Sequence, residues 1–168
     1  VIADALARHG FQVPILVDLT ETSIEKALAI DWLAYDLICL GFPSYQWSPP
    51  RPVKTLLSRK YDSYRAEGRV KLGAPSVPGR HALVFCTYSG IHTGMDEALP
   101  ATKHAGQYFA HLGFSVVDDW CIVGDSHESE ETSRHGRLGD IRGRPNKDDL
   151  VAVQQGVADL VRTVTKHG

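Results

Sequence analysis

Two loops of the sequence place aromatic rings beside hydroxyl groups and glycines. The first loop, "GFPSYQWSPP" at residues 41–50, carries Tyr45 and Trp47 among prolines. The second loop, "TYSGIHTG" at residues 87–94, carries Tyr88. A flat ring system with polar edges needs an aromatic face to stack on and backbone or hydroxyl groups for its heteroatoms. The two loops together therefore predict a site that holds a flat heteroaromatic ligand.

Small residues of the second loop would complete this site. Gly90 and Gly94 would let the backbone approach a ring edge closely enough to hydrogen-bond it. Hydroxyl donors and acceptors would come from Thr87, Ser89 and Thr93. These residues predict the polar half of the site.

Simpler explanations remain open for the conspicuous side chains. Tyr45 and Trp47 would also suit a hydrophobic plug or a contact between copies of the chain in a homo-oligomer, because aromatics are enriched at interfaces. Imidazoles can transfer protons near neutral pH, which makes His92 a weak candidate for a catalytic proton donor, while a surface histidine is the simpler interpretation. The other histidines lack carboxylates or thiols at metal-ligand spacing, so we expect no metal site.

Both loops follow apolar runs that predict buried strands. Apolar periodicity, capping residues and glycines predict an alternation of five helices and four strands along the chain. The helices are expected at 1–10, 22–32, 51–68, 96–112 and 147–168, and the strands at 11–20, 35–41, 81–90 and 114–124. Thr22 with Glu25, and Asn146 with Asp149, are the expected helix caps. The polar stretch 125–144 is expected to be a loop.

This alternation predicts an α/β fold with a doubly wound, open parallel sheet and helices on both faces. A TIM barrel would need roughly 250 residues and eight repeats, so the 168-residue chain favours an open sheet in a single domain. In such sheets, ligands bind at the carboxyl ends of the strands. Both aromatic loops are expected at that edge.

Composition limits the possible partners. Lys and Arg number 18 against 20 Asp and Glu, so no basic field attracts nucleic acid, and no apolar run is long enough to span a bilayer. Cys39, Cys86 and Cys121 each lie in an apolar stretch without a Cys-x-x-Cys motif. They predict buried, reduced thiols and a cytoplasmic location.

The loop motifs resemble those of the flavodoxin-like superfamily, which includes flavodoxins and FMN-dependent NAD(P)H:quinone oxidoreductases. "GFPSYQWSPPRPVKTLL" resembles the family's second flavin-binding loop, and "FCTYSGIHTGMDEA" resembles the third. The resemblance covers the chain in element order and implies a five-stranded sheet of order 2-1-3-4-5 with FMN at the strand ends. It implies that one side of the isoalloxazine is lined by Pro43, Ser44, Tyr45 and Trp47 and the other by Thr87, Tyr88, Ser89 and Gly90.

The sequence departs from the family pattern at two places. Gln46 and Trp47 follow Tyr45 where many members have a glycine, so the flavin-linked peptide flip of the family is not expected. The family's first strand and hydroxyl-rich phosphate loop would precede Val1, and we expect residues 1–168 to be an N-terminally truncated flavodoxin-like domain. Phosphate binding at a helix N-terminus is a strong anchor, so we expect this chain alone to bind FMN weakly or not at all.

The resemblance implies an FMN-binding redox protein that transfers electrons or reduces a quinone-like small acceptor with NAD(P)H. The near-neutral charge favours the reductase over an acidic electron carrier. The alternative is a flavin-free flavodoxin-like interaction or scaffold domain. FMN, NAD(P)H, a quinone or a protein redox partner are therefore the expected partners.

The stretch "GRLGDIRGRPN" at residues 136–146 has two interpretations. Its arginines, Arg137, Arg142 and Arg144, would suit the phosphate of a nicotinamide nucleotide or an acidic partner. They would equally suit a tight turn with an ion pair to Asp140. Both interpretations stay open from the residues alone.

Overall fold

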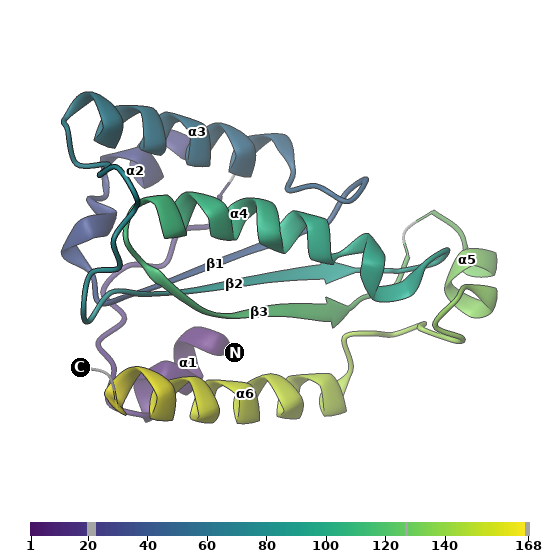
Figure 1. Ribbon diagram of the computed structural model, residues 1–168. Helices are drawn as coiled ribbons and strands as arrows, with labels where there is room; N and C mark the ends of the chain where they lie inside the picture. The colour runs from purple at the N-terminus through teal and green to yellow at the C-terminus, as the bar shows by residue number, and fades with distance from the viewer. Residues whose placement is uncertain (20–22, 127, 167–168) are drawn as a thin grey trace.

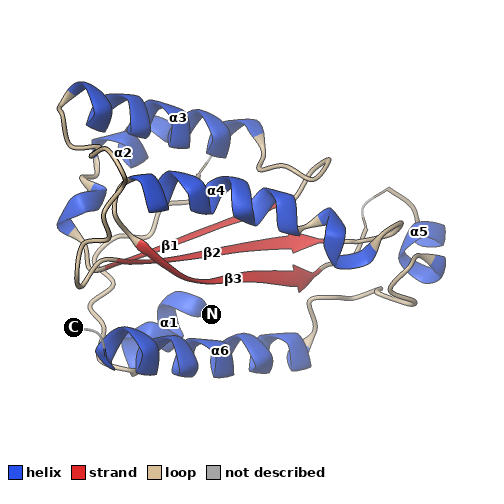
Figure 2. Cartoon of the chain, in the orientation of Figure 1, coloured by secondary structure: helices blue, strands red, loops and turns tan. Residues whose placement is uncertain are grey.

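The computed structural model describes residues 1–19, 23–126 and 128–166, which form a parallel sheet between two layers of helices (Figure 1). The strands β1 (Leu37–Pro43), β2 (His81–Tyr88) and β3 (Ser115–Val123) lie side by side in the order β1-β2-β3. The register pairs Leu37 with His81 and Tyr88 with Val123, so the carboxyl ends of all three strands meet at one edge (Figure 2). The predicted α/β class with an open parallel sheet is confirmed.

The central strand β2 is buried on both faces, which explains why its sequence is apolar throughout. Ala82 and Val84 are fully buried in the core on the side of α3 (Arg51–Ala66) and α4 (Leu99–His111). Leu83 is fully buried in the opposite core, on the side of the remaining helices.

The layer of α3 and α4 also contains the short helices α2 (Ile24–Ala29), η1 (Trp32–Ala34) and η2 (Gly94–Glu97). Phe109 of α4 is completely buried and stacks on Trp32, with ring centroids 5.3 Å apart. The Tyr64 hydroxyl of α3 accepts the Trp32 backbone N–H at 2.7 Å and donates to the Asp31 carboxylate at 2.9 Å. Burial and the hydrogen bond to Asp31 raise the pKa of Tyr64 to about 12. These contacts join α3 and α4 to the η1 segment.

The opposite layer consists of α1 (Ile2–Arg8) and the long α6 (Lys147–Lys166), which pack against each other (Figure 1). The cap predicted for α6 is confirmed. The Asn146 side chain accepts the backbone N–H groups of Asp148 and Asp149 at 2.9 and 3.2 Å. The Asp149 carboxylate in turn accepts the Asn146 N–H at 2.7 Å, so the two side chains cap each other's backbone.

The strand predicted at 11–20 is wrong for its described part, because residues 11–19 form no regular ladder. Cavities of about 390 and 750 Å³ are each lined by both this segment and β1. A strand needs a neighbouring backbone for its hydrogen bonds, and β2 is the only strand paired with β1 among the described residues. Leu16 is accordingly 83% exposed. Residue 20 lies outside the described residues.

Two further predictions need correction. The helix expected at 22–32 is divided into α2 and η1, and Thr22 of the expected cap lies outside the described residues. The stretch 125–144 is not simply a loop, because it contains α5 (Glu130–His135), whose first turn is capped by the Ser129 hydroxyl accepting the Thr132 N–H at 3.1 Å. Ser129 followed by two glutamates was the available sequence signal.

Within the described ranges, no helix combines the length and apolarity needed to cross a membrane.

Candidate functional site

A cavity of about 540 Å³ lies at the carboxyl edge of the sheet. Its size falls within the usual range of small-molecule sites. The loop after β1, the loop after β2, residues 124–126 with Glu128, and residues 144–145 form its walls. It brings together eight of the predicted site residues, namely Pro43, Ser44, Tyr45, Trp47, Thr87, Tyr88, Ser89 and His92.

The first wall is a tight hairpin turn that presents two aromatic side chains. Tyr45 and Ser48 exchange both backbone hydrogen bonds, each 3.0 Å long. The central residues Gln46 and Trp47 have φ of 48° and 60°, as a type I′ turn requires. This conformation favours Gly or Asn, and it costs another L-residue about 1 kcal/mol. Tyr45 and Trp47 nevertheless remain 61% and 63% exposed, so the turn holds two rings in solvent against a backbone cost.

Ser44 attaches this turn to the neighbouring loops. Its backbone N–H donates to the Thr87 carbonyl at 2.8 Å, and its hydroxyl donates to the Glu97 carbonyl at 2.9 Å. Backbone strain of this kind persists only where surrounding contacts impose it, and it is concentrated at ligand sites. The hairpin bonds and the two Ser44 hydrogen bonds are contacts that hold this turn in place.

The second wall differs from the expected stacking surface. Tyr88 is only 7% exposed and belongs to the core under α4, and this burial raises its pKa. The Glu97 carboxylate accepts the backbone N–H groups of His92 and Thr93 at 2.7 and 2.6 Å, which closes the 90–97 turn. Thr87, Ser89 and the exposed His92 remain at the cavity wall.

Gly90 and Gly94 do not line the cavity. They have φ of 58° and 72°, and a Cβ on Gly90 would lie 2.8 Å from the Tyr88 ring and 2.9 Å from the Gly94 carbonyl oxygen. Their role in the structure is to permit the close turn behind Tyr88.

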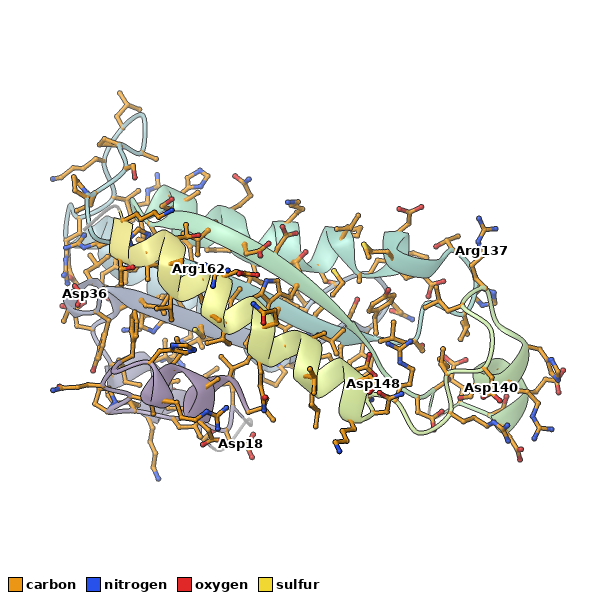
Figure 3. All side chains as sticks on the ribbon, turned by 90° about the horizontal axis from the view of Figure 1, so that it is seen from below. Asp18, Asp36, Arg137, Asp140, Asp148 and Arg162 are labelled. Carbon is orange, nitrogen blue, oxygen red and sulfur yellow. The ribbon has the colours of Figure 1, made fainter. Side chains whose placement is uncertain are left out.

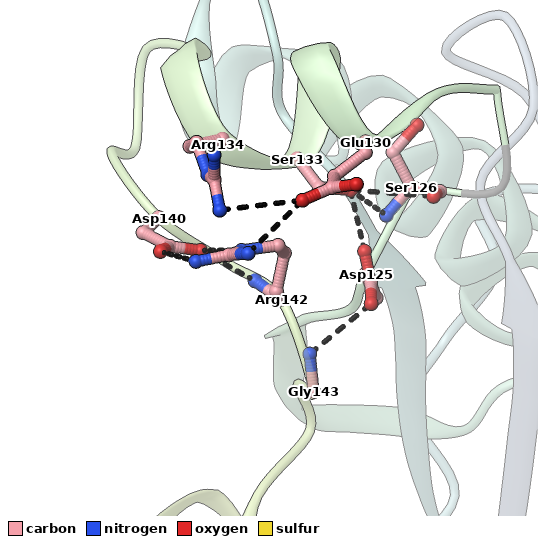
Figure 4. A network of polar contacts seen from close by, with 8 residues as sticks. All are labelled: Asp125, Ser126, Glu130, Ser133, Arg134, Asp140, Arg142 and Gly143. Carbon is pink, nitrogen blue, oxygen red and sulfur yellow. Dashed lines mark hydrogen bonds and ion pairs between the residues drawn. The ribbon is translucent and has the colours of Figure 1, made fainter.

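The third wall, formed by residues around Asp125 and Arg144, was not predicted from the sequence. A network of polar contacts holds it in place (Figure 4). Asp125, which follows β3, accepts the Gly143 N–H at 3.1 Å and a hydrogen bond from the Ser133 hydroxyl. Arg142 donates to Asp140 at 2.8 and 2.6 Å and to Glu130 at 3.2 Å. The hydrogen bonds from Arg142 hold the pKa of Asp140 well below its usual range. The ion pair considered for this loop is therefore present.

The arginines of this segment have different environments. Arg137 is exposed at the end of the molecule and does not line the cavity (Figure 3). Arg144 lines it, and its guanidinium binds the largely buried Asp149 carboxylate, with Nε 2.9 Å from Oδ2. This bond lowers the pKa of Asp149 and raises that of Arg144. The Arg144 charge is thus partly neutralised beside the cavity.

A comparison of Trp47→Gly with Trp47→Ala measures the backbone strain of the turn. Relative to Trp47→Ala, which removes the same ring but keeps the strained φ, the glycine variant is expected to be more stable by about 1 kcal/mol. Urea unfolding followed by circular dichroism measures the difference. Equal stabilities of the two variants would show that the turn is not strained.

A scan of known protein-family models finds no match to this sequence. No curated protein is significantly similar to it either.

Proposed function

We propose that the protein is a flavodoxin-like, FMN-binding redox protein that transfers electrons or reduces a quinone-like acceptor with NAD(P)H. The observation that carries this proposal is the cavity at the carboxyl ends of the parallel strands, with exposed Tyr45 and Trp47 on a strained turn at one wall. Energetically costly exposure of two rings favours a ligand that stacks on them.

The residues of the cavity suit the ring system of a flavin more than its phosphate. Tyr45 and Trp47 would hold the isoalloxazine face, and the Thr87 and Ser89 hydroxyls would hydrogen-bond its polar edge. Arg144 also lines the cavity, but its guanidinium is paired with Asp149. Its charge is therefore partly neutralised, which would weaken its attraction for a phosphate. When bound, FMN would supply the electron and hydride chemistry, while the protein residues orient the ring and exclude water.

The finer topology is part of the same proposal. A further strand would lie between β1 and residues 11–19, giving the order 2-1-3-4-5 with residues 11–19 at the edge. The two cavities shared by this segment and β1 support this placement, because their apolar linings would cover both faces of an inserted strand. We propose that this strand and a phosphate-binding loop precede Val1.

FMN titration tests the function. A longer polypeptide, extended upstream of Val1 in its reading frame, is expected to quench flavin fluorescence stoichiometrically, and the 168-residue chain is expected to do so weakly or not at all. Substitution Tyr45→Ala in the longer polypeptide should weaken FMN binding by about two- to tenfold, since an aromatic stacking pair contributes about 0.5–1.5 kcal/mol. Leu72→Ala, at a fully exposed leucine outside the cavity, is the control.

The same preparation distinguishes the two activities. Bleaching of the bound flavin by NADPH, with reoxidation by a quinone, would support the reductase, and bleaching by a reduced protein partner alone would support the electron carrier. Absence of flavin binding by the longer polypeptide would contradict the proposal. The exposed Tyr45 and Trp47 would then favour an interaction or scaffold domain that presents them to a protein partner.

A further inference from the structure

Two cysteines that are far apart in the sequence face each other in the sheet. Cys86 of β2 and Cys121 of β3 are register partners on adjacent parallel strands. Their side chains contribute to the same core cluster, on the α4 side of the sheet. Cys39 of β1 packs into the cluster on the opposite face. The fold therefore forms one thiol pair and leaves the third cysteine away from it.

The backbone separation suits a covalent link. Adjacent strands lie about 4.7–4.9 Å apart, which falls within the range of about 4.4–6.8 Å between the Cα atoms of disulfide-bonded cysteines. Cys86 is completely buried, whereas Cys121 lies on the edge strand and is partly exposed. A small reagent can therefore reach Cys121 first.

The surroundings of the pair make its two thiols unequal. A hydrogen bond from the Cys86 thiol is the main cause that lowers the pKa of Cys121. Burial and the Asp119 carboxylate act against it, and the Thr102 hydroxyl and the Lys103 ammonium act with it. The same hydrogen bond, with burial, raises the pKa of Cys86. Thiolates are the nucleophilic form of cysteine, so Cys121 is the attacking residue and Cys86 the resolving one.

We propose that Cys86 and Cys121 form a two-electron redox site that a peroxide converts to an intramolecular disulfide. The Cys121 thiolate attacks one peroxide oxygen, the O–O bond breaks, and the departing hydroxide takes a proton and leaves as water. The Cys86 sulfur then attacks the resulting sulfenic sulfur, the S–O bond breaks, and a second water leaves with the Cys86 proton. The two sulfurs together lose two electrons to the peroxide.

This disulfide would link β2 to β3 directly before the cavity. Cys86 precedes Thr87 and Tyr88 in the chain, and the Tyr88 carbonyl accepts the Gly124 N–H at 2.8 Å where β3 ends. Oxidation would thus join the strands that carry the second and third walls of the cavity. The site rests on the strand register and on the different exposure of the two cysteines, and it does not depend on FMN.

Hydrogen peroxide treatment of the folded chain, followed by peptide mapping without reductant, tests the proposal. We expect one cross-linked peptide pair containing Cys86 and Cys121, a mass lower by two hydrogen atoms, and a fall from three titratable thiols to one in denaturant. Dithiothreitol should restore all three. The wild-type map decides the question even where a cysteine variant fails to fold.

Cys39 provides the matched control. Cys39→Ser should still form the Cys86–Cys121 disulfide, whereas Cys121→Ser should form no intramolecular disulfide, since burial raises the pKa of Cys39 to about 12. The proposal is overturned if Cys121 is oxidised to sulfinic acid while Cys86 stays a free thiol. A disulfide that involves Cys39, or three unchanged thiols after peroxide treatment, would overturn it equally.

Discussion

Substitution Phe109→Ala is expected to lower the free energy of unfolding by about 3–5 kcal/mol, the usual range for removing a buried aromatic ring. Phe109 is completely buried, stacks on Trp32 at 5.3 Å and meets the edge of Phe114 at 5.8 Å. These contacts join α4 to the η1 segment and to the start of β3. The cavity left by alanine would be lined by rings that cannot easily collapse into it. Chemical denaturation followed by circular dichroism measures the loss.

Leu72→Ala is the matched control for this core substitution. Leu72 is fully exposed, so its loss should change the stability by less than about 0.5 kcal/mol. A loss below about 1 kcal/mol for Phe109→Ala would contradict the packing described here, because it would mean that the ring is not held between α4 and η1.

Substitution Gly90→Ala is expected to cost about 2–4 kcal/mol and to distort the second wall of the cavity. Part of this cost is the left-handed backbone, since φ is 58° and an alanine there loses about 1 kcal/mol. The rest is overpacking, because the added methyl group would lie 2.9 Å from the Gly94 carbonyl oxygen and 2.8 Å from the Tyr88 ring. The carbonyl belongs to the backbone of the same turn, so the methyl group can be accommodated only if the turn moves.

Gly139→Ala isolates the two parts of this cost. Gly139 has φ of 76°, but nothing lies within 4 Å of the position of its missing Cβ. Its substitution should therefore cost only the backbone part, about 1 kcal/mol, in the same denaturation experiment. If both variants lose the same stability, the close contact at Gly90 makes no contribution.

Local sequence signals predicted most of the regular structure. The apolar runs around residues 37–43, 81–88 and 115–123 became the three strands, and Asn146 with Asp149 caps α6 as expected. These signals act within a few residues, through side-chain burial and hydrogen bonds to nearby backbone. The apolar run at 11–19 is the informative failure, because composition predicts a capacity for strand formation and not the presence of a pairing partner.

The sequence predicted the location of the candidate site but not the roles of its residues. The carboxyl ends of parallel strands must meet at one edge, so the loops after residues 43 and 88 could be placed beside each other before the structure was known. The roles of individual residues could not be predicted in this way. Tyr88 is buried, Gly90 shapes a turn, and the wall formed by Asp125 and Arg144 depends on a segment that returns to the cavity from beyond α5.

The sequence by itself determined the α/β alternation, the cap of α6 and the positions of the two aromatic loops, because each depends on neighbours within one or two turns of chain. Only the tertiary structure decided which groups meet across long separations. Register brings Cys86 opposite Cys121, and the fold brings the Gly143 N–H to the Asp125 carboxylate at the cavity wall. It also holds Trp47 in a conformation that its own backbone preference opposes, since Ser44 bonds to two neighbouring segments and offsets the local cost.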